Sequence, residues 1–350
     1  MNRVMAHCPH ARRVRTIKPH RLLIALFCAV SGTAQTPQAA PLKLVQTIRL
    51  QVSGRLNHMI VDRLNDRAFV TRNDTVEVVD LRTAQTVASI TNPGRPGELI
   101  YFKKCDCIAY STSSGALRIL NPNTLTAEEE FALGGGAGSV ALDPQHGLVY
   151  VAQSGAGVDK QHSRITFIDL MERKKSGQIS VEGGKLGQVV LEHHGPRGYV
   201  NDTATNQVLV IDLNERRVVE RWNLSVGVEN VSLALDENNH RLLVGSRKPD
   251  TLIVIDTITG KAVAHLPSTS DVDDMAYDAK LRRIYMSGND GFVDVFQQEG
   301  PNAYSHIARI PTGSGAGKSK WVPEQDRLYV EMSSRKPSEK AQVLVFESVE

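Results

Sequence analysis

A pair of short apolar runs, rich in Val and Ile, recurs along most of this chain. The first run of each pair resembles "RAFVTR" or "LVYVAQ" and begins in turn at Arg67, Cys107, Leu148, Arg197, Arg241, Arg283 and Arg327. The intervals between these starts are 40, 41, 49, 44, 42 and 44 residues. Self-similarity at such a period indicates supersecondary units that stack on one another. The sequence therefore predicts an array of seven repeats.

Each repeat has the pattern of four strands separated by polar turns. In the fifth repeat the apolar segments are "ENVSLALD", "RLLVGS", "TLIVID" and "KAVAHL", and the turns between them are "ENNH", "RKPD" and "TITG". Four antiparallel strands at this period are typical of a β-propeller blade. No helical periodicity of useful length follows residue 40. We predict an all-β fold, a seven-bladed β-propeller of four-stranded antiparallel blades over residues 44–350.

The two ends of the repeat array predict how the ring closes. The last repeat stops at Glu350, just after its third strand, and "LVQTIRL" at residues 44–50 resembles the fourth strand of a blade. An open ring would expose strand edges and lose one interface between blades. We therefore expect the N-terminal strand to complete the seventh blade.

The first 34 residues have the order of a secretory signal. Five basic residues between Arg12 and Arg21 precede the apolar run "RLLIALFCAV", which is followed by the small residues Gly32 and Ala34. Basic, apolar and small segments in this order are typical of a cleaved signal peptide. We predict a signal peptide over 1–34, a linker over 35–43, and export to the periplasm or the extracellular space.

Export would change the charge of the protein. Six basic residues and no acidic ones leave with residues 1–34, so 35 basic and 38 acidic residues remain and the net charge falls from +3 to −3. Nucleic-acid binding relies on a basic surface with exposed aromatic side chains, and aromatics make up 5% of the chain. We therefore expect no nucleic-acid partner. The apolar run at residues 21–30 is also too short to span a membrane.

Cys105 and Cys107, in "KKCDCIAY", are the two cysteines that remain after the signal. Their spacing is neither that of a thioredoxin motif nor sufficient for a zinc site. A disulfide and a pair of free thiols both fit the sequence.

Several motifs resemble the YVTN-type β-propeller repeats of exported bacterial proteins. The resemblance rests on "LVYVAQ", "IDTITGK" and the repeat period, and it covers residues 44–350. A subgroup of secreted propellers is similar at "GRLNHMIVD", "GSRKPDTLIVIDTITGKAVAHLP", "DVDDMAYDAKLRRIYMSGNDGFVDVF" and "ARIPTGSGAGKS", although Asn57 stands where that subgroup usually has Asp. The resemblance implies a propeller and export. For function it implies a binding scaffold or a lactonase-like enzyme.

The segment "TGSGAGKSK" at residues 312–320 is similar to a phosphate-binding P-loop. A P-loop needs Gly where Thr312 stands, and it needs a helix after the loop so that the helix N-terminus faces phosphate. A further strand containing Trp321 follows instead. We therefore interpret the segment as a loop between blades.

Aligning the repeats gathers polar side chains around the axis of the predicted ring. They lie on the face where the loops leading into the innermost strands meet the loops between second and third strands, here called the top face. Concave polar mouths of this kind are usual ligand sites. The candidate ligand-binding residues are Asn57, His58, Glu98, Gln188, Asn201, Arg247, Asp273, Asp274 and Lys318, with Ser139 and Asn230 in the same ring.

Two functions fit this funnel. The first is an exported, monomeric binding or scaffold protein that holds a small molecule or a protein ligand at the top face. The alternative is a metal-dependent, lactonase-like hydrolase of small molecules. In that case Glu98, Asp273 and Asp274 would hold a divalent cation such as Ca²⁺, which prefers oxygen ligands, and His58 would act as a general base beside Asp273 or Asp274. The sequence assigns no catalytic residue.

Overall fold

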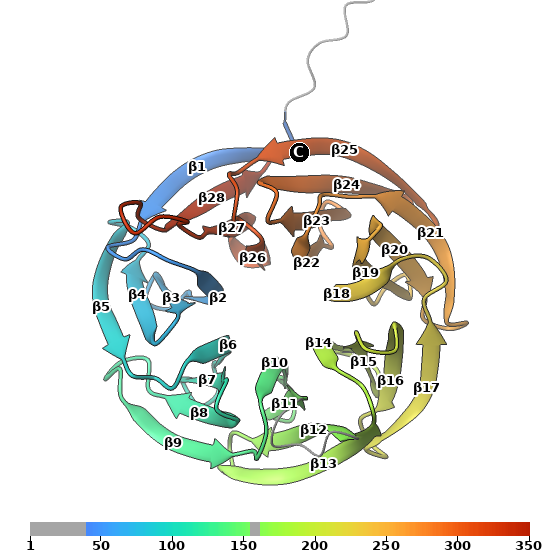
Figure 1. The fold of residues 1–350 in the computed structure, drawn as a ribbon, viewed down its shortest axis with the longest axis horizontal. Helices are drawn as coiled ribbons and strands as arrows, with labels where there is room; N and C mark the ends of the chain where they lie inside the picture. The colour runs from blue at the N-terminus through green and yellow to red at the C-terminus, as the bar shows by residue number, and fades with distance from the viewer. Residues whose placement is uncertain (1–39, 155–161) are drawn as a thin grey trace, which may run out of the picture. The chain divides into compact units, whose positions relative to one another are not determined.

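The predicted repeats fold as seven four-stranded antiparallel sheets arranged in a ring (Figure 1). The computed structural model describes residues 40–154 and 162–350. The predicted signal peptide and most of the predicted linker lie outside these residues. The prediction of an all-β, seven-bladed β-propeller is confirmed.

The four strands of each blade run in sequence order from the axis outward, except in the seventh blade. The innermost strands are β2 (Leu56–Asp62), β6 (Pro96–Phe102), β10 (Ala137–Asp143), β14 (Leu186–Leu191), β18 (Val228–Asp236), β22 (Val272–Asp278) and β26 (Lys318–Val322). The second strands are β3 (Arg67–Arg72), β7 (Cys107–Thr112), β11 (Leu148–Gln153), β15 (Arg197–Asp202), β19 (Arg241–Lys248), β23 (Arg283–Gly288) and β27 (Arg327–Met332).

The third strands carry the second apolar run of each repeat, and the outer strands face solvent. The third strands are β4 (Thr75–Asp80), β8 (Ala116–Leu120), β12 (His162–Asp169), β16 (Gln207–Asp212), β20 (Asp250–Asp256), β24 (Phe292–Gly300) and β28 (Gln342–Ser348). The outer strands are β5 (Gln85–Thr91), β9 (Ala127–Ala132), β13 (Lys174–Glu182), β17 (Arg217–Asn223), β21 (Lys261–Pro267), β25 (Ala303–Pro311) and β1 (Leu42–Arg49). A single-turn 3₁₀ helix, η1 (Pro323–Gln325), follows β26.

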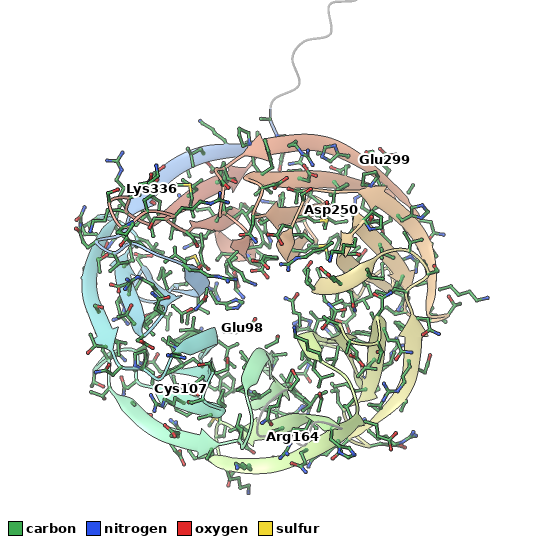
Figure 2. The ribbon with its side chains drawn as sticks, in the orientation of Figure 1. Glu98, Cys107, Arg164, Asp250, Glu299 and Lys336 are labelled. Atoms are coloured by element: carbon green, nitrogen blue, oxygen red, sulfur yellow. A yellow bond between two sulfur atoms is a disulfide. The ribbon has the colours of Figure 1, made fainter. Side chains whose placement is uncertain are left out.

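The middle two strands of each blade are apolar on both faces because a neighbouring blade covers each face. In β16 four consecutive residues, Val208–Ile211, are fully buried. The side chains of Tyr199 and Val208 in the fourth blade pack in one cluster with Leu242 and Val244 of the fifth. The outer strand β5 instead alternates exposed and half-buried residues, as expected for a strand with one solvated face. The core of the protein therefore consists of layers between blades, and side chains occupy the space between neighbouring blades all around the ring in Figure 2.

In four blades, one aspartate at the end of the third strand stabilises the polar turn that follows. In the fifth blade, Oδ1 of Asp256 accepts hydrogen bonds from the backbone N–H groups of Ile258 and Thr259, both at 2.9 Å. Asp80, Asp169 and Asp212 accept from the same two positions after their own strands. Aspartate stabilises such turns by replacing a backbone acceptor. The recurring "ID" and "VD" motifs thus end the strands.

The N-terminal strand closes the ring as predicted. Strand β1 pairs with β28 antiparallel, from Leu42 opposite Ser348 to Arg49 opposite Gln342, with a register shift between Leu44 and Gln46. The pairing begins two residues before the predicted boundary at residue 44. The seventh blade therefore joins the two ends of the described chain, as the meeting of β1 and β28 in Figure 1 shows.

Deleting residues 44–50 removes most of β1, and we expect the midpoint of thermal unfolding to fall by about 10 °C or more, or soluble expression to fail. The physical reason is that β28 would become an unpaired edge strand. Circular dichroism melts of the purified protein measure the effect, and a deletion of residues 35–39, which precede β1, serves as the control. Equal melting temperatures for the intact protein and the 44–50 deletion would contradict closure by β1.

Candidate functional site

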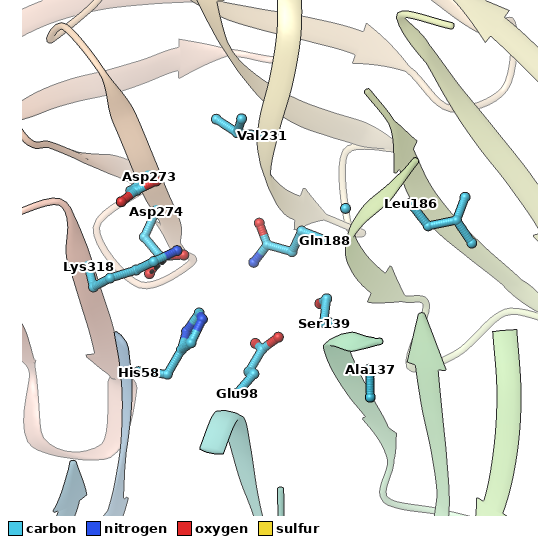
Figure 3. Close-up of a pocket in the computed structure, with 13 residues that line it drawn as sticks. His58, Glu98, Ala137, Ser139, Leu186, Gln188, Val231, Asp273, Asp274 and Lys318 are labelled. Carbon is cyan, nitrogen blue, oxygen red and sulfur yellow. Dashed lines mark ion pairs between the residues drawn. The ribbon is translucent and has the colours of Figure 1, made fainter. Parts of the chain in front are cut away.

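Six innermost strands direct a polar side chain at one equivalent position toward the axis. These side chains are His58, Glu98, Ser139, Gln188, Asp274 and Lys318, and they line one cavity of about 270 Å³ (Figure 3). A β-bulge immediately precedes or contains this position in β2, β6, β10, β14 and β22. Bulges re-aim side chains in this way. We call these six residues the axial ring.

Four residues of the axial ring also connect neighbouring blades. Each accepts a hydrogen bond from a backbone N–H of the next innermost strand: Glu98 from Val140 (3.0 Å), Ser139 from Val189 (3.3 Å), Gln188 from Leu233 (2.6 Å) and Asp274 from Ser319 (3.2 Å). Backbone N–H groups that lose water need such acceptors. Part of the polarity around the axis is therefore structural.

His58 and Lys318 are the two members of the axial ring that make no such bond. The imidazole of His58 has no hydrogen-bond partner among the described residues, and its backbone N–H donates to Thr71 (3.0 Å). Burial lowers the pKa of His58 well below its usual value, and the positive charges of Lys318, Lys320 and Arg55 lower it further. The ring is therefore neutral at pH 7 and offers one donor and one acceptor to the cavity.

Lys318 provides the positive charge of the cavity. Its Nζ lies 4.0 Å from Oδ2 of Asp274. Burial alone would lower the pKa of Lys318, but the negative charges of Asp274, Asp273 and Glu98 outweigh it and raise the pKa above its usual value. Burial raises the pKa of Asp274 to about 6, opposed by Lys318 and reinforced by Glu98. A charged lysine thus faces a carboxyl group that titrates just below neutral pH.

Glu331 is a titratable residue that sequence reasoning missed. It lies on β27 directly opposite Lys318 on β26, with 1% of its surface exposed. Its Oε2 has no hydrogen-bond partner in the part of the chain that the structure describes. Burial, reinforced by the charge of Asp274, raises the pKa of Glu331 to about 8. Glu331 is therefore protonated at pH 7. The signal for it was a lone acidic residue in the apolar run "RLYVEM".

The structure brings together six of the nine candidate residues. His58, Glu98, Gln188, Asp273, Asp274 and Lys318 line the 270 Å³ cavity. Asp273 also forms an ion pair with Arg247 and accepts a hydrogen bond from Asn289 (3.0 Å). Burial opposes ionisation of Asp273, but Lys318, Asn289 and Arg247 lower its pKa overall.

The other three candidates do not line this cavity. Arg247 lies behind Asp273 and donates to the backbone oxygen of Val272 (2.8 Å). Asn201 is fully buried on the second strand β15 and accepts a hydrogen bond from Asn230 (2.7 Å). Asn57 lines a neighbouring pocket with Asn73 and Arg95. Asn57 does not face the axis because the bulge in β2 turns the adjacent residue, His58, toward the axis instead.

The carboxylates proposed for a metal are engaged by the protein. Glu98 accepts from Val140, Asp273 pairs with Arg247, and Asp274 accepts from Ser319. Within residues 40–154 and 162–350, no three His, Cys, Asp or Glu side chains lie close enough together to hold a metal ion. A divalent cation at Glu98, Asp273 and Asp274 stays a prediction, and we derive no step from it.

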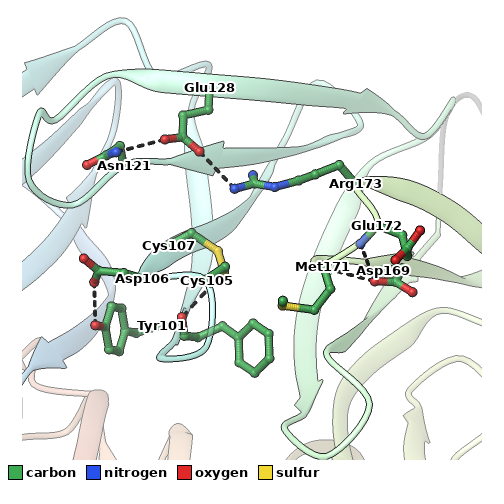
Figure 4. The surroundings of a disulfide bond; sticks show 11 residues. Tyr101, Cys105, Asp106, Cys107, Asn121, Glu128, Asp169, Met171, Glu172 and Arg173 are labelled. Carbon is green, nitrogen blue, oxygen red and sulfur yellow. Dashed lines mark hydrogen bonds and ion pairs between the residues drawn. A yellow bond between two sulfur atoms is a disulfide. The ribbon is translucent and has the colours of Figure 1, made fainter.

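Two other features of the sequence, the P-loop-like segment and the cysteine pair, do not contribute to the cavity. The loop at residues 312–317 leads into β26, a strand that begins at Lys318, so the helix of a P-loop does not follow it. Cys105 and Cys107 form a disulfide in the turn between β6 and β7, and neither lines the 270 Å³ cavity (Figure 4). The structure thereby selects one of the two possibilities that the sequence left open.

Comparison with known proteins identifies the fold and nothing finer. No family model matches the sequence, and no curated protein matches it. A chain in the crystal structure of a mitotic checkpoint complex superimposes with a TM-score of 0.74 and 11% identity, covering 95% of this chain and 100% of the other. At this identity the likeness shows the β-propeller fold alone. Among the described residues, no helix is long and apolar enough to cross a lipid bilayer.

The raised pKa of Glu331 predicts how stability depends on pH. Its pKa of about 8 lies above the usual value, so between these values the folded protein keeps a proton that the unfolded chain releases, and stability falls as pH rises. Glu331→Gln removes this loss, which amounts to as much as about 1.4 kcal/mol per pH unit. We expect similar urea unfolding free energies at pH 5 and a more stable variant at pH 8.

The matched control is Glu339→Gln, which changes an exposed glutamate on the loop between β27 and β28. It should follow the pH dependence of the unchanged protein. A Glu331→Gln variant with that same pH dependence would show that Glu331 is ionised in the folded state.

Proposed function

We propose that this chain is an exported β-propeller of the YVTN type that binds a small polar molecule in the top-face cavity. The observation that carries the proposal is the pairing of His58 and Lys318 in one cavity. Neither side chain makes the hydrogen bond to the next blade that four other axial residues make. The ring of His58 has no hydrogen-bond partner among the described residues, and Lys318 has the 4.0 Å contact with Asp274, so a role in binding explains why both side chains face the cavity.

The charges of the cavity limit the chemistry of the ligand. Lys318 and the neutral imidazole of His58 favour a hydroxyl, carbonyl or carboxylate oxygen, whereas Asp274 and Glu98 favour a hydrogen-bond donor. The volume of about 270 Å³ lies just below the usual range for ligand pockets. A small molecule that carries both kinds of group, such as an amino acid or a sugar, therefore fits better than a protein segment.

The hydrolase alternative has one observation in its favour. The pKa of Asp274, raised to about 6 by burial, is near the range in which a carboxylate works as a general base at neutral pH. Its oxygen Oδ2 is engaged by Ser319 and lies 4.0 Å from Lys318. Hydrolysis of small lactones, assayed with and without added Ca²⁺, tests this alternative directly.

A thermal-shift screen with a defined panel tests the binding proposal. The panel contains amino acids, dicarboxylates, sugars, polyamines and small lactones. At 100 times its Kd a ligand adds about 2.7 kcal/mol to stability, so we expect at least one class to raise the melting temperature. His58→Ala and Lys318→Met should each weaken that ligand about tenfold or more, because each loses a direct contact.

The control for this screen is His194→Ala. His194 lies in the exposed turn between β14 and β15, with its ring 3.6 Å from Glu237, and its loss should leave ligand binding unchanged. A ligand that stabilises all four proteins equally, or a panel without any hit, would count against a binding site at the axial ring.

Export is the second part of the proposal. The disulfide between Cys105 and Cys107 supports it, because structural disulfides persist mainly in oxidising compartments. The basic, apolar and small segments of residues 1–34 support it independently.

Expression in a bacterial host with a periplasm tests export. We expect the protein in the periplasmic fraction with a mature N-terminus close to residue 35, read by N-terminal sequencing or intact mass. The double substitution Leu23→Arg and Leu26→Arg should block cleavage because it interrupts the apolar run. Full-length protein that retains Met1 in the cytoplasm would contradict export.

A further inference from the structure

A second cavity lies along the axis of the propeller, beyond the axial ring. This lower cavity has a volume of about 570 Å³ and opens toward the face opposite the top face, where the innermost strands end. Its walls include Val61, Ile100, Leu142, Val190, Leu235 and Trp321. Glu98 and Gln188 line both cavities. The two side chains therefore form the boundary between the two cavities, and both point toward the centre in Figure 3.

The apolar walls of the lower cavity are only partly covered by the protein. Ile100, Leu142 and Leu235 each pack with one side against the clusters between blades and remain half-buried. A channel filled with water would tolerate polar side chains at these positions. Contiguous apolar surface that stays accessible is typical of binding sites. The volume of the lower cavity also lies within the range of small-molecule pockets.

The hydrogen bonds between blades determine what Glu98 and Gln188 can offer a ligand. Oε1 of Gln188 accepts from the backbone N–H of Leu233 (2.6 Å), so its amide nitrogen points elsewhere and keeps two donors. Oε2 of Glu98 accepts from Val140 (3.0 Å), and its Oε1 has no partner in the described part of the chain. The boundary thus presents one oriented acceptor and one oriented donor.

The outer opening of the lower cavity carries a positive charge, because Lys320 lines it and forms no ion pair among the described residues. Arg63 and Glu324 at this rim neutralise each other in an ion pair of 3.0 Å. Lys320 and His193 also line the opening. A carboxylate can be attracted to Lys320 at the opening, but at the boundary it has no N–H or O–H to donate to Glu98, whereas a neutral donor does.

We propose that the lower cavity binds a small neutral molecule with an apolar body and a terminal carboxamide, which donates a hydrogen bond to Glu98 and accepts one from Gln188. A carboxamide carries both groups at one end, so it matches the boundary pair, and its apolar body matches the walls. This site goes beyond the proposed function, because it takes a different class of ligand and opens on the opposite face.

Three probes of equal body size test the proposal: 4-hexylbenzamide, methyl 4-hexylbenzoate and 4-hexylbenzoate. Trp321 lines the lower cavity, whereas the other tryptophan, Trp222, lies on the outer strand β17. In a Trp222→Phe background, the fluorescence of Trp321 therefore reports binding. We expect the benzamide to bind at least about tenfold more tightly than the ester or the benzoate, neither of which can donate to Glu98.

Two substitutions locate the effect. Glu98→Gln must keep an oxygen toward the N–H of Val140, so it presents a donor instead of an acceptor, and the preference for amide over ester should fall below about threefold. Ser139→Ala is the control for disturbed contacts between blades: it removes one such hydrogen bond, but Ser139 does not line the lower cavity. It should leave the preference for the amide unchanged.

A third set of variants separates this site from the top-face cavity. Ala141→Trp, or Val190→Trp if the first fails to fold, fills the lower cavity and should abolish binding of the benzamide. His58→Ala and Lys318→Met should leave it unchanged, whatever they do to ligands of the upper cavity. Absence of binding by all three probes, equal affinity for amide and ester, or benzamide binding that survives in a folded filled variant would overturn the proposal.

Discussion

The pairing of β1 with β28 is the interaction on which the rest of the molecule depends. A propeller blade buries its two middle strands only if another blade covers each face, so every blade needs two neighbours. The pairing from Leu42–Ser348 to Arg49–Gln342 completes the seventh blade with a strand from the other end of the chain. Closure places seven innermost strands around one axis, and side chains far apart in the sequence, such as His58 and Lys318, thereby share a cavity.

The axis is a place where structural and ligand-binding demands meet. Inner strands of adjacent blades diverge from one another, and side chains such as Glu98 and Gln188 satisfy the N–H groups left between them. The hydrogen bond to the next blade occupies one terminal atom of each side chain and orients its second terminal atom. The same contact that joins two blades therefore fixes which atom faces the channel. His58 and Lys318 make no hydrogen bond to the next blade. Burial and the neighbouring charges determine their protonation states.

Repetition explains why so much of the fold could be predicted from the sequence. The middle strands are mostly apolar because both faces are buried, and in four blades an aspartate at the end of the third strand marks the turn, as Asp256 does. Equivalence between repeats also located His58, Glu98, Gln188, Asp274 and Lys318 at one cavity. The same reasoning misplaced one residue, in the fifth blade. The position in β18 equivalent to Asp274 is Ser232, which lies four residues before Asp236 as Asp274 lies four before Asp278, and Asn230 lies two residues earlier.

The residues that could not be placed from the sequence are those whose position depends on how deeply the side chain is buried. Glu331 was missed because second strands are otherwise packed between blades, and only its place opposite Lys318 brings it near the cavity. Asn201 was misplaced for the same reason, since a polar residue on a second strand can be wholly buried. The lower cavity has no sequence signal, because half-buried residues such as Ile100 are indistinguishable in sequence from those of the core.

The central claim is that His58 is a half-buried, neutral side chain facing Lys318 and the channel. A pH titration of the His58 ring by nuclear magnetic resonance, with His58→Ala used to assign its signals, measures this directly. The account predicts that the imidazole stays neutral to well below pH 6.5, because burial and the charges of Lys318, Lys320 and Arg55 lower its pKa. An imidazole that takes up its proton at or above the usual pKa of 6.5 would contradict it.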